Sequence, residues 1–134
     1  MRIIILIFSL IWCVTVSSAP EKKAAINPDI YTEDKLGIMV TKDHAQFQIK
    51  LKSNATTGYS WFLREYNSDI IIPVQRTIIP PETKMMGAPG FELWTFKVKP
   101  TAFTVPQQTM IRLIYSRPWD SNDQSKQVVF RVST

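Results

Sequence analysis

The sequence predicts an all-β fold, an antiparallel β-sandwich of the immunoglobulin-like type with six to eight short strands and no disulfide. Short runs rich in β-branched and aromatic residues recur from Leu36 to the C-terminus. The nine prolines and four glycines fall mainly between these runs. No long segment has the 3.6-residue period of an amphipathic helix. Strands of this kind bury one face of each sheet against the other.

The segment 44–51 is the clearest strand. Its residues alternate strictly, so that Ala45, Phe47, Ile49 and Leu51 share one face while polar side chains take the other. We therefore expect this face to point into the core. Further strands are expected at 59–66, 70–72, 92–98, 110–115 and 127–133.

Two of these strands carry specific expectations. The β-branched run 70–72 is expected to end at Pro73, because proline cannot donate a backbone hydrogen bond to a neighbouring strand. In 92–98, the alternate residues Trp94, Phe96 and Val98 are expected to point inward.

The first 19 residues have the layout of a secretory signal peptide. Arg2 supplies a positive charge, an apolar run follows over 3–16, and small residues stand at 17–19. Cleavage is expected near 18–19, and the protein is expected to be periplasmic or secreted. The alternative, a retained membrane anchor, requires roughly 20 apolar residues, which this run does not reach.

Removal of residues 1–19 removes Cys13, the one cysteine of the chain, so the exported form would hold no thiol and no disulfide. The segment 20–34 is polar and is expected to be a flexible N-terminal arm. The remaining residues, 35–134, are enough for one sandwich domain. The net charge is +5, but the sequence has no block of five or more Lys and Arg residues. We expect a monomer that binds neither nucleic acid nor, in its mature form, a membrane.

No enzyme motif is present, so we expect no catalytic residue, no metal site and no cofactor. His44 is the one histidine and lies on the polar side of a strand, where a surface role is more common than that of a base or a ligand. The acidic pairs Glu33/Asp34 and Asp120/Asp123 lie in polar surface sequence, where carboxylates are ordinarily ionised and inactive.

Binding is the better interpretation of two polar turns. In 54–59, Gly58 permits a positive φ, and the short side chains of Asn54, Thr56 and Thr57 can bond to their own backbone and fix the loop. A loop fixed in advance loses less entropy on docking. An ordinary hairpin connection remains the alternative for this segment.

The second turn contains Arg117, Pro118 and Trp119, followed by a solvent-facing stretch. Exposed Trp and Arg are enriched at interface hot spots. Pro118 restricts the backbone around the indole and so helps to hold it in one pose. The alternative is a Trp119 folded back over the edge of a sheet.

Together with a glycine-bearing segment between them, these turns resemble the three loop motifs of the chagasin family of cysteine-peptidase inhibitors. The motifs occur in the family's order, and the similarity covers roughly 35–134. The residues concerned are Asn54, Ala55, Thr56, Thr57, Gly58 and Tyr59, then Gly87, Ala88, Pro89 and Gly90, then Arg117, Pro118 and Trp119.

The resemblance implies a reversible protein inhibitor of papain-like cysteine peptidases with an immunoglobulin-like fold. The three segments would then form a wedge at one end of the sandwich. Thr56 and Thr57 would enter the active-site cleft above the catalytic Cys–His pair, and 87–90 would lie along one side. Arg117 and Trp119 would pack on the other side. Such a wedge blocks the cleft without a covalent bond.

The chain departs from the family pattern at two positions. Ala55 stands where the family has proline, and the change from proline to alanine relaxes the loop backbone. Ala55 also completes a glycosylation sequon at Asn54, and a glycan there would obstruct the wedge. Pro89 replaces a glycine and removes one backbone N–H, so we expect altered peptidase selectivity.

Two other functions are compatible with the sequence. A non-inhibitory immunoglobulin-like module for adhesion or assembly in the cell envelope would share the fold and an exposed Trp119. A sugar-binding module could use Trp119 as a stacking platform. The inhibitor requires 54–59, 87–90 and 117–120 at the same end of the sandwich, and a location at opposite ends would exclude the wedge.

Overall fold

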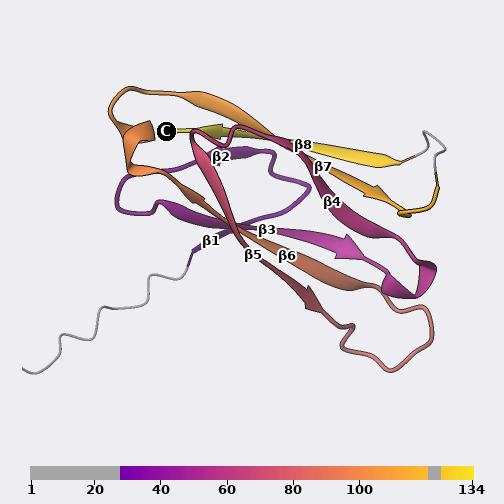
Figure 1. Ribbon diagram of the computed structural model, residues 1–134. Coiled ribbons are helices and arrows are strands. Elements are labelled where there is room, and N and C mark those ends of the chain that lie inside the picture. The colour runs from indigo at the N-terminus through magenta and orange to yellow at the C-terminus, as the bar shows by residue number, and fades with distance from the viewer. Residues whose placement is uncertain (1–27, 121–124) are drawn as a thin grey trace, which may run out of the picture.

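The computed structural model describes residues 28–120 and 125–134. The expected signal peptide, residues 20–27 and Asp123 lie outside the described part. Within that part the chain forms strands and two single-turn 3-10 helices (Figure 1). In chain order these are β1 (Asp29–Tyr31), β2 (Gly37–Met39), β3 (Gln46–Ser53), η1 (Ala55–Thr57), β4 (Ser60–Tyr66), β5 (Ile71–Ile79), β6 (Gly90–Val98), η2 (Pro100–Phe103), β7 (Gln108–Ser116) and β8 (Lys126–Ser133).

The strands form two four-stranded sheets that pack face to face, with the orders β1-β3-β6-β5 and β2-β8-β7-β4. The predicted all-β sandwich is confirmed. The sheets are mixed rather than wholly antiparallel, because β1 pairs with β3 and β2 with β8 in parallel. Both exceptions are three-residue edge strands, which are too short to reveal their partner or direction by alternation.

The core lies between the two sheets and follows the predicted alternation. Phe47, Ile49 and Leu51 of β3 are fully buried, as are Phe96 and Val98 of β6. The opposite sheet contributes apolar side chains from β4, β7 and β8. Its largest buried members are Trp61, Phe130, Ile111 and Leu113, together with Ile38 of β2.

Two segments differ from expectation. The prediction that the strand after 70 ends at Pro73 is wrong, since β5 continues to Ile79 with a register shift between Pro73 and Gln75. β5 is an edge strand, where a residue without an N–H can face solvent and leave the ladder intact. Within the expected arm 20–34, residues 29–31 form β1 against β3.

The pairing register brings three connections to one end of the sandwich. Ser53, the last residue of β3, pairs with Gly90, the first residue of β6, and Ile79 at the end of β5 pairs with Phe91. In the other sheet, Ser60 at the start of β4 pairs with Ser116 at the end of β7. The β3–β4 and β5–β6 connections and residues 117–120 after β7 therefore lie together, on the right in Figure 1.

No helix in the described ranges is both long and apolar enough to pass through a bilayer.

Candidate functional site

Three connections make up the candidate site. We call 54–59 the first loop, 80–89 the second loop and 117–120 the third loop. Gly90, which belongs to the predicted site, is the first residue of β6 and follows the second loop directly. The expectation that 54–59, 87–90 and 117–120 lie at one end of the sandwich is confirmed.

The first loop is a single turn of 3-10 helix held at both ends. Asn54 caps its start: the side-chain Oδ1 accepts hydrogen bonds from Thr56 N at 3.2 Å and Thr56 Oγ1 at 2.6 Å. Gly58 caps its end with φ 78° and donates its N–H to the Ala55 carbonyl at 3.2 Å. A side chain at Gly58 would strain this left-handed backbone. Thr57 Oγ1 adds a bond to the Asn54 carbonyl at 2.7 Å.

Ala55, Thr56 and Thr57 form the exposed apex of this turn. The backbone of the turn is satisfied largely from within the loop, so its shape does not depend on a partner. The expected bonds from side chain to loop backbone are present for Asn54 and Thr57, whereas the Thr56 hydroxyl bonds to the Asn54 side chain.

The second loop is joined to the first by one hydrogen bond. Asn54 Nδ2 donates to the Gly87 carbonyl at 3.1 Å. Gly87 has φ 81°, a left-handed conformation that favours glycine. Thus the Asn54 side chain uses its oxygen to cap the first loop and its nitrogen to hold the second.

The third loop is joined to the first by Arg117 and Trp119. Arg117 Nε donates to the Thr57 carbonyl at 3.1 Å, and the guanidinium lies 4.5 Å from the centre of the Tyr59 ring. Trp119 lies against Gly58, where an added Cβ would come within 2.9 Å of the indole Cη2 atom. The indole remains 73% exposed, so it is not folded away over a sheet edge.

An aromatic cluster supports the three loops from below. Tyr115 stacks with Tyr59 at a centroid distance of 5.3 Å and contacts Trp61 at 5.0 Å. The Tyr115 hydroxyl accepts a hydrogen bond from Asn54 N at 2.9 Å, and Trp61 Nε1 donates to the Lys52 carbonyl at 2.8 Å. Tyr59 and Trp61 thus anchor the base of the first loop.

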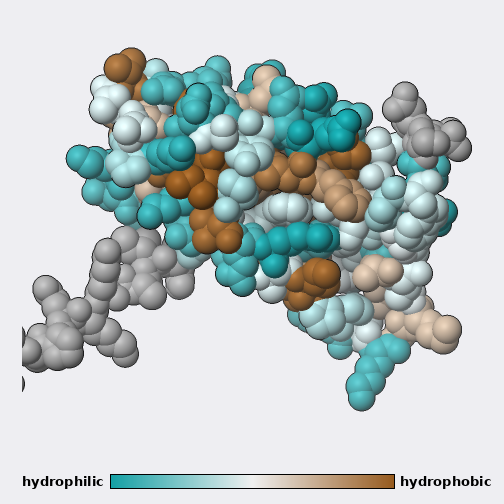
Figure 2. All heavy atoms as spheres, viewed as in Figure 1, coloured by the Kyte–Doolittle hydropathy of each residue, from teal (hydrophilic) through white to brown (hydrophobic). Residues whose placement is uncertain are grey.

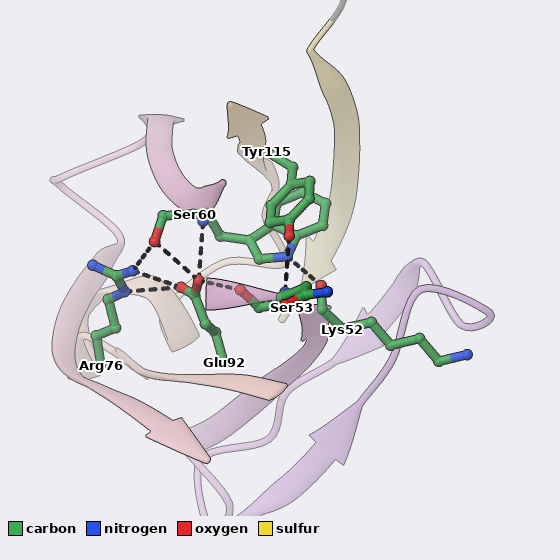
Figure 3. A network of polar contacts seen from close by, with 8 residues as sticks. Lys52, Ser53, Ser60, Arg76, Glu92 and Tyr115 are labelled. Atoms are coloured by element: carbon green, nitrogen blue, oxygen red, sulfur yellow. Dashed lines mark hydrogen bonds and ion pairs between the residues drawn. The ribbon is translucent and has the colours of Figure 1, made fainter. Parts of the chain in front are cut away.

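Sequence reasoning missed Glu92, which lies beneath the first loop at 1% exposure. Figure 3 shows its carboxylate among Ser53, Ser60 and Arg76. The signal was present in the sequence: Glu92 is in phase with Trp94, Phe96 and Val98, so alternation places it on the inward face.

The loop end has a surface of intermediate character. In Figure 2 this end, on the right, is mostly pale, whereas the side of the sandwich shows separate teal and brown areas. The pale colours reflect Thr, Gly, Ser, Pro and aromatic residues, which lie near the middle of the hydropathy scale. The second loop adds two exposed methionines, Met85 and Met86. The first loop contains no charged residue, so its apex can dock against protein without stripping a charge of water.

His44, which was considered as a base or a metal ligand, does not belong to the candidate site. His44 is exposed in the turn before β3, at the end of the sandwich opposite the loops. Over residues 28–120 and 125–134, no group of His, Cys, Asp and Glu is arranged to hold a metal ion.

Comparisons with known proteins agree with this geometry. The family model described as "Chagasin family peptidase inhibitor I42" matches residues 41–133, which include all three loops. Chagasin of Trypanosoma cruzi is 30% identical over 89 residues, covering 62% of this chain and 76% of that protein.

Solved structures show the same fold. The cysteine protease inhibitor EhICP2 of Entamoeba histolytica has a TM-score of 0.60 and 28% identity, covering 78% of this chain and 92% of that one. PbICP-C, solved in complex with falcipain-2, has a TM-score of 0.53 and 19% identity, covering 80% and 88%, a similarity that concerns the fold alone. On the family match and the identity to chagasin, this chain belongs to the chagasin family of peptidase inhibitors.

Proposed function

We propose that this protein is a reversible inhibitor of papain-like cysteine peptidases that occludes the active-site cleft with its three loops. The observation that carries the proposal is the cross-bonding of the loops at one end of the sandwich. The first loop bonds to the second through Asn54 and to the third through Arg117. Three segments distant in sequence thus form one rigid projecting edge, which is what insertion into a cleft requires.

In this proposal the apex of the first loop enters the cleft. Thr56 and Thr57 are exposed there and offer small side chains and backbone groups to the region above the catalytic Cys–His pair. The apex is a helical turn capped at both ends, so it does not offer an extended peptide for cleavage. Inhibition therefore proceeds by steric occlusion and not through a covalent intermediate.

The flanking loops divide the remaining contacts. The second loop, with 87–90 at its β6 end, lies along one side of the cleft, and exposed Trp119 packs against the peptidase on the other. Arg117 also has a task within the inhibitor itself. Its guanidinium faces the Thr57 carbonyl and the Tyr59 ring, so it holds the first loop in place for docking.

The two departures from the family pattern adjust affinity and selectivity. Pro89 is exposed immediately before β6 and offers no N–H to a peptidase, so enzymes that require a donor there are bound less tightly. Inhibition constants for Pro89→Gly that match the wild type across several peptidases would exclude this role. Ala55 completes a glycosylation sequon at Asn54, which proline at this position would abolish. A glycan on Asn54 Nδ2 would occupy the apex.

We further propose that the chain is exported, acts as a monomer and has no catalytic activity of its own. The layout of residues 1–19 supports export. The wedge requires a bare Asn54, so the producing organism is expected not to glycosylate it. Mass spectrometry of the native protein tests export and glycosylation. The expected mass is that of a chain that begins near residues 18–20 and carries no glycan on Asn54.

Titration of papain with the purified protein tests the proposal, with trypsin as the serine-peptidase control. The expected result is a stoichiometric, reversible loss of papain activity at low enzyme concentration, competitive with substrate, and no loss of trypsin activity. No inhibition of papain or of a panel of cathepsin-type enzymes would contradict the proposal. A non-inhibitory binding module would then be the better account of the exposed Trp119.

A further inference from the structure

We propose that Glu92 is a positioning residue for inhibition: its buried carboxylate holds both ends of the first loop and fixes them relative to the second. This inference rests on the proposed function, because its effect is seen as inhibition of a peptidase. The fold alone does not call for a charge at this place, since the neighbouring inward positions of β6 are occupied by Trp94, Phe96 and Val98.

The contacts of one carboxylate oxygen reach both ends of the first loop. Glu92 Oε1 accepts hydrogen bonds from Ser53 Oγ at 2.8 Å and from Ser60 Oγ at 3.3 Å. Ser53 immediately precedes the first loop and Ser60 immediately follows it. A third bond, from Trp61 N at 3.2 Å, fixes the start of β4. The two ends of the turn therefore share one acceptor, as Figure 3 shows.

The other oxygen joins this point to β5. Arg76 donates to Glu92 Oε2 through Nε at 2.9 Å, and its Nη2 lies 2.8 Å from the same oxygen. The Nη2 group also donates to Ser60 Oγ at 2.9 Å. Arg76 lies on β5 and Glu92 on β6, the two strands that bracket the second loop. One ion pair thus connects the bases of the first and second loops.

The cost of burial indicates a role beyond packing. Among the described residues Glu92 is the one charged side chain that is buried. Removing a carboxylate from water is unfavourable, and replacing a buried ion pair by apolar residues of similar volume is often neutral or stabilising. A carboxylate, unlike an apolar side chain, can accept several directed bonds at once. A loop is oriented by directed hydrogen bonds rather than by the volume that a side chain fills, so a carboxylate suits this place better than an apolar residue.

The test compares Glu92→Gln with two matched variants. The substituted glutamine keeps the shape of the side chain but loses the charge opposite Arg76 and presents an amide where two acceptors are needed. Glu65→Gln removes the same kind of ion pair, Glu65–Arg112, from an exposed site on β4 and β7. Val132→Ala truncates the core at the opposite end of the sandwich, where Val132 pairs with Thr109.

Two readouts separate positioning from stability. The first readout is hydrogen exchange in the free protein at the Thr57 and Gly58 amides, which bond within the first loop. In Glu92→Gln their exchange is expected to accelerate at least about tenfold, under conditions where the core amide of Leu113 stays protected. The inhibition constant for papain, measured where each variant is folded, is expected to rise about tenfold or more. Glu65→Gln and Val132→Ala are expected to leave both readouts at the wild-type level.

Unchanged loop exchange and an unchanged inhibition constant in Glu92→Gln would overturn the inference, as would an equal rise in Val132→Ala. Should Glu92→Gln not fold, Ser60→Ala and Ser53→Ala each remove one hydroxyl from the same carboxylate and are expected to give smaller changes in the same direction. Should the wild-type protein not inhibit papain, the proposed function fails. The exchange measurement on the free protein still decides whether Glu92 positions the loop.

Discussion

The indole of Trp119 lies directly against Gly58, so that the third loop covers the end of the turn formed by the first. A Cβ on Gly58 would lie 2.9 Å from Cη2 and 3.2 Å from Cζ2 of the indole. Gly58 also has a φ of 78°. Glycine is therefore required here twice, by the backbone of one loop and by the side chain of another.

Gly58→Ala is expected to weaken inhibition strongly while the sandwich still folds. Alanine in the left-handed region costs about 1–2 kcal/mol. In addition, the methyl group must displace Trp119 from its place beside the apex. We expect a rise in the papain inhibition constant of more than about tenfold, measured by titration.

Gly87→Ala is the matched control for Gly58→Ala. Gly87 has a φ of 81°, but an added Cβ meets no atom within 4 Å. Gly87→Ala therefore introduces the same backbone strain as Gly58→Ala but no collision with another side chain. If the two variants lose the same free energy of unfolding in urea, backbone strain explains the whole cost and the Trp119 contact contributes nothing.

Trp119→Ala is expected to separate affinity from stability. The side chain is largely exposed, so its loss changes the free energy of unfolding by no more than about 0.5 kcal/mol. As an interface hot spot it is expected to cost about 2 kcal/mol of binding, roughly a 30-fold rise in the inhibition constant. Met110→Ala, an exposed apolar side chain near the other end of β7, is the control and should leave inhibition unchanged.

Asn54→Asp tests the bond between the first and second loops. Aspartate keeps the oxygen that caps Thr56 but loses the amide that donates to Gly87, and it turns a carboxylate toward that carbonyl. We expect the unfolding midpoint in urea to change little and the inhibition constant to rise several-fold. Inhibition equal to the wild type would show that the second loop does not depend on Asn54.

Ala55→Pro is expected to stabilise the protein. Ala55 is the first residue of η1, a position that accepts proline, and Asn54 before it is extended with φ −116° and ψ 93°. The gain is expected to be about 0.4–1 kcal/mol, because the unfolded chain loses freedom. Urea denaturation measures it, and inhibition should be equal or stronger. A loss of stability would show that the backbone of Ala55 is incompatible with proline.

Tyr31 gives the sandwich a dependence on high pH. Burial, together with the negative charge of Asp29, raises the pKa of the Tyr31 phenol above its ordinary value of 10.0. The folded state therefore holds this proton more tightly than the unfolded state. The resulting stability is complete below about pH 10 and is lost as the pH rises through the folded-state pKa. Urea denaturation from about pH 8 to about pH 11.5 should show this slope, and Tyr31→Phe should flatten it.

Much of the fold could be predicted from the sequence because its strands alternate clearly. The inward face of β3 and the burial of Phe96 and Val98 follow from a period of two. The continuation of β5 past Pro73 could not be predicted, because it depends on β5 being an edge strand, which is a property of the whole sheet. The parallel partners of β1 and β2 are likewise set by tertiary contacts.

The candidate site was predictable as a set of segments but not as a structure. The turns 54–59 and 117–119 and the exposure of Trp119 could be expected from local sequence, whereas 87–90 was identified through the resemblance to the chagasin family. The bonds that unite them, from Asn54 to Gly87 and from Arg117 to Thr57, join residues far apart in the chain. Glu92 was overlooked because a lone carboxylate in a strand ordinarily faces solvent, although alternation with Trp94, Phe96 and Val98 places it on the inward face.

The most direct test of the wedge is the hydrogen-exchange footprint of the protein in complex with papain. A wedge of three loops predicts added protection over 54–58, 87–90 and 117–119, and none at the opposite end around η2 and 42–45. Protection confined to an edge strand or to the opposite end, with the three loops unchanged, would contradict it.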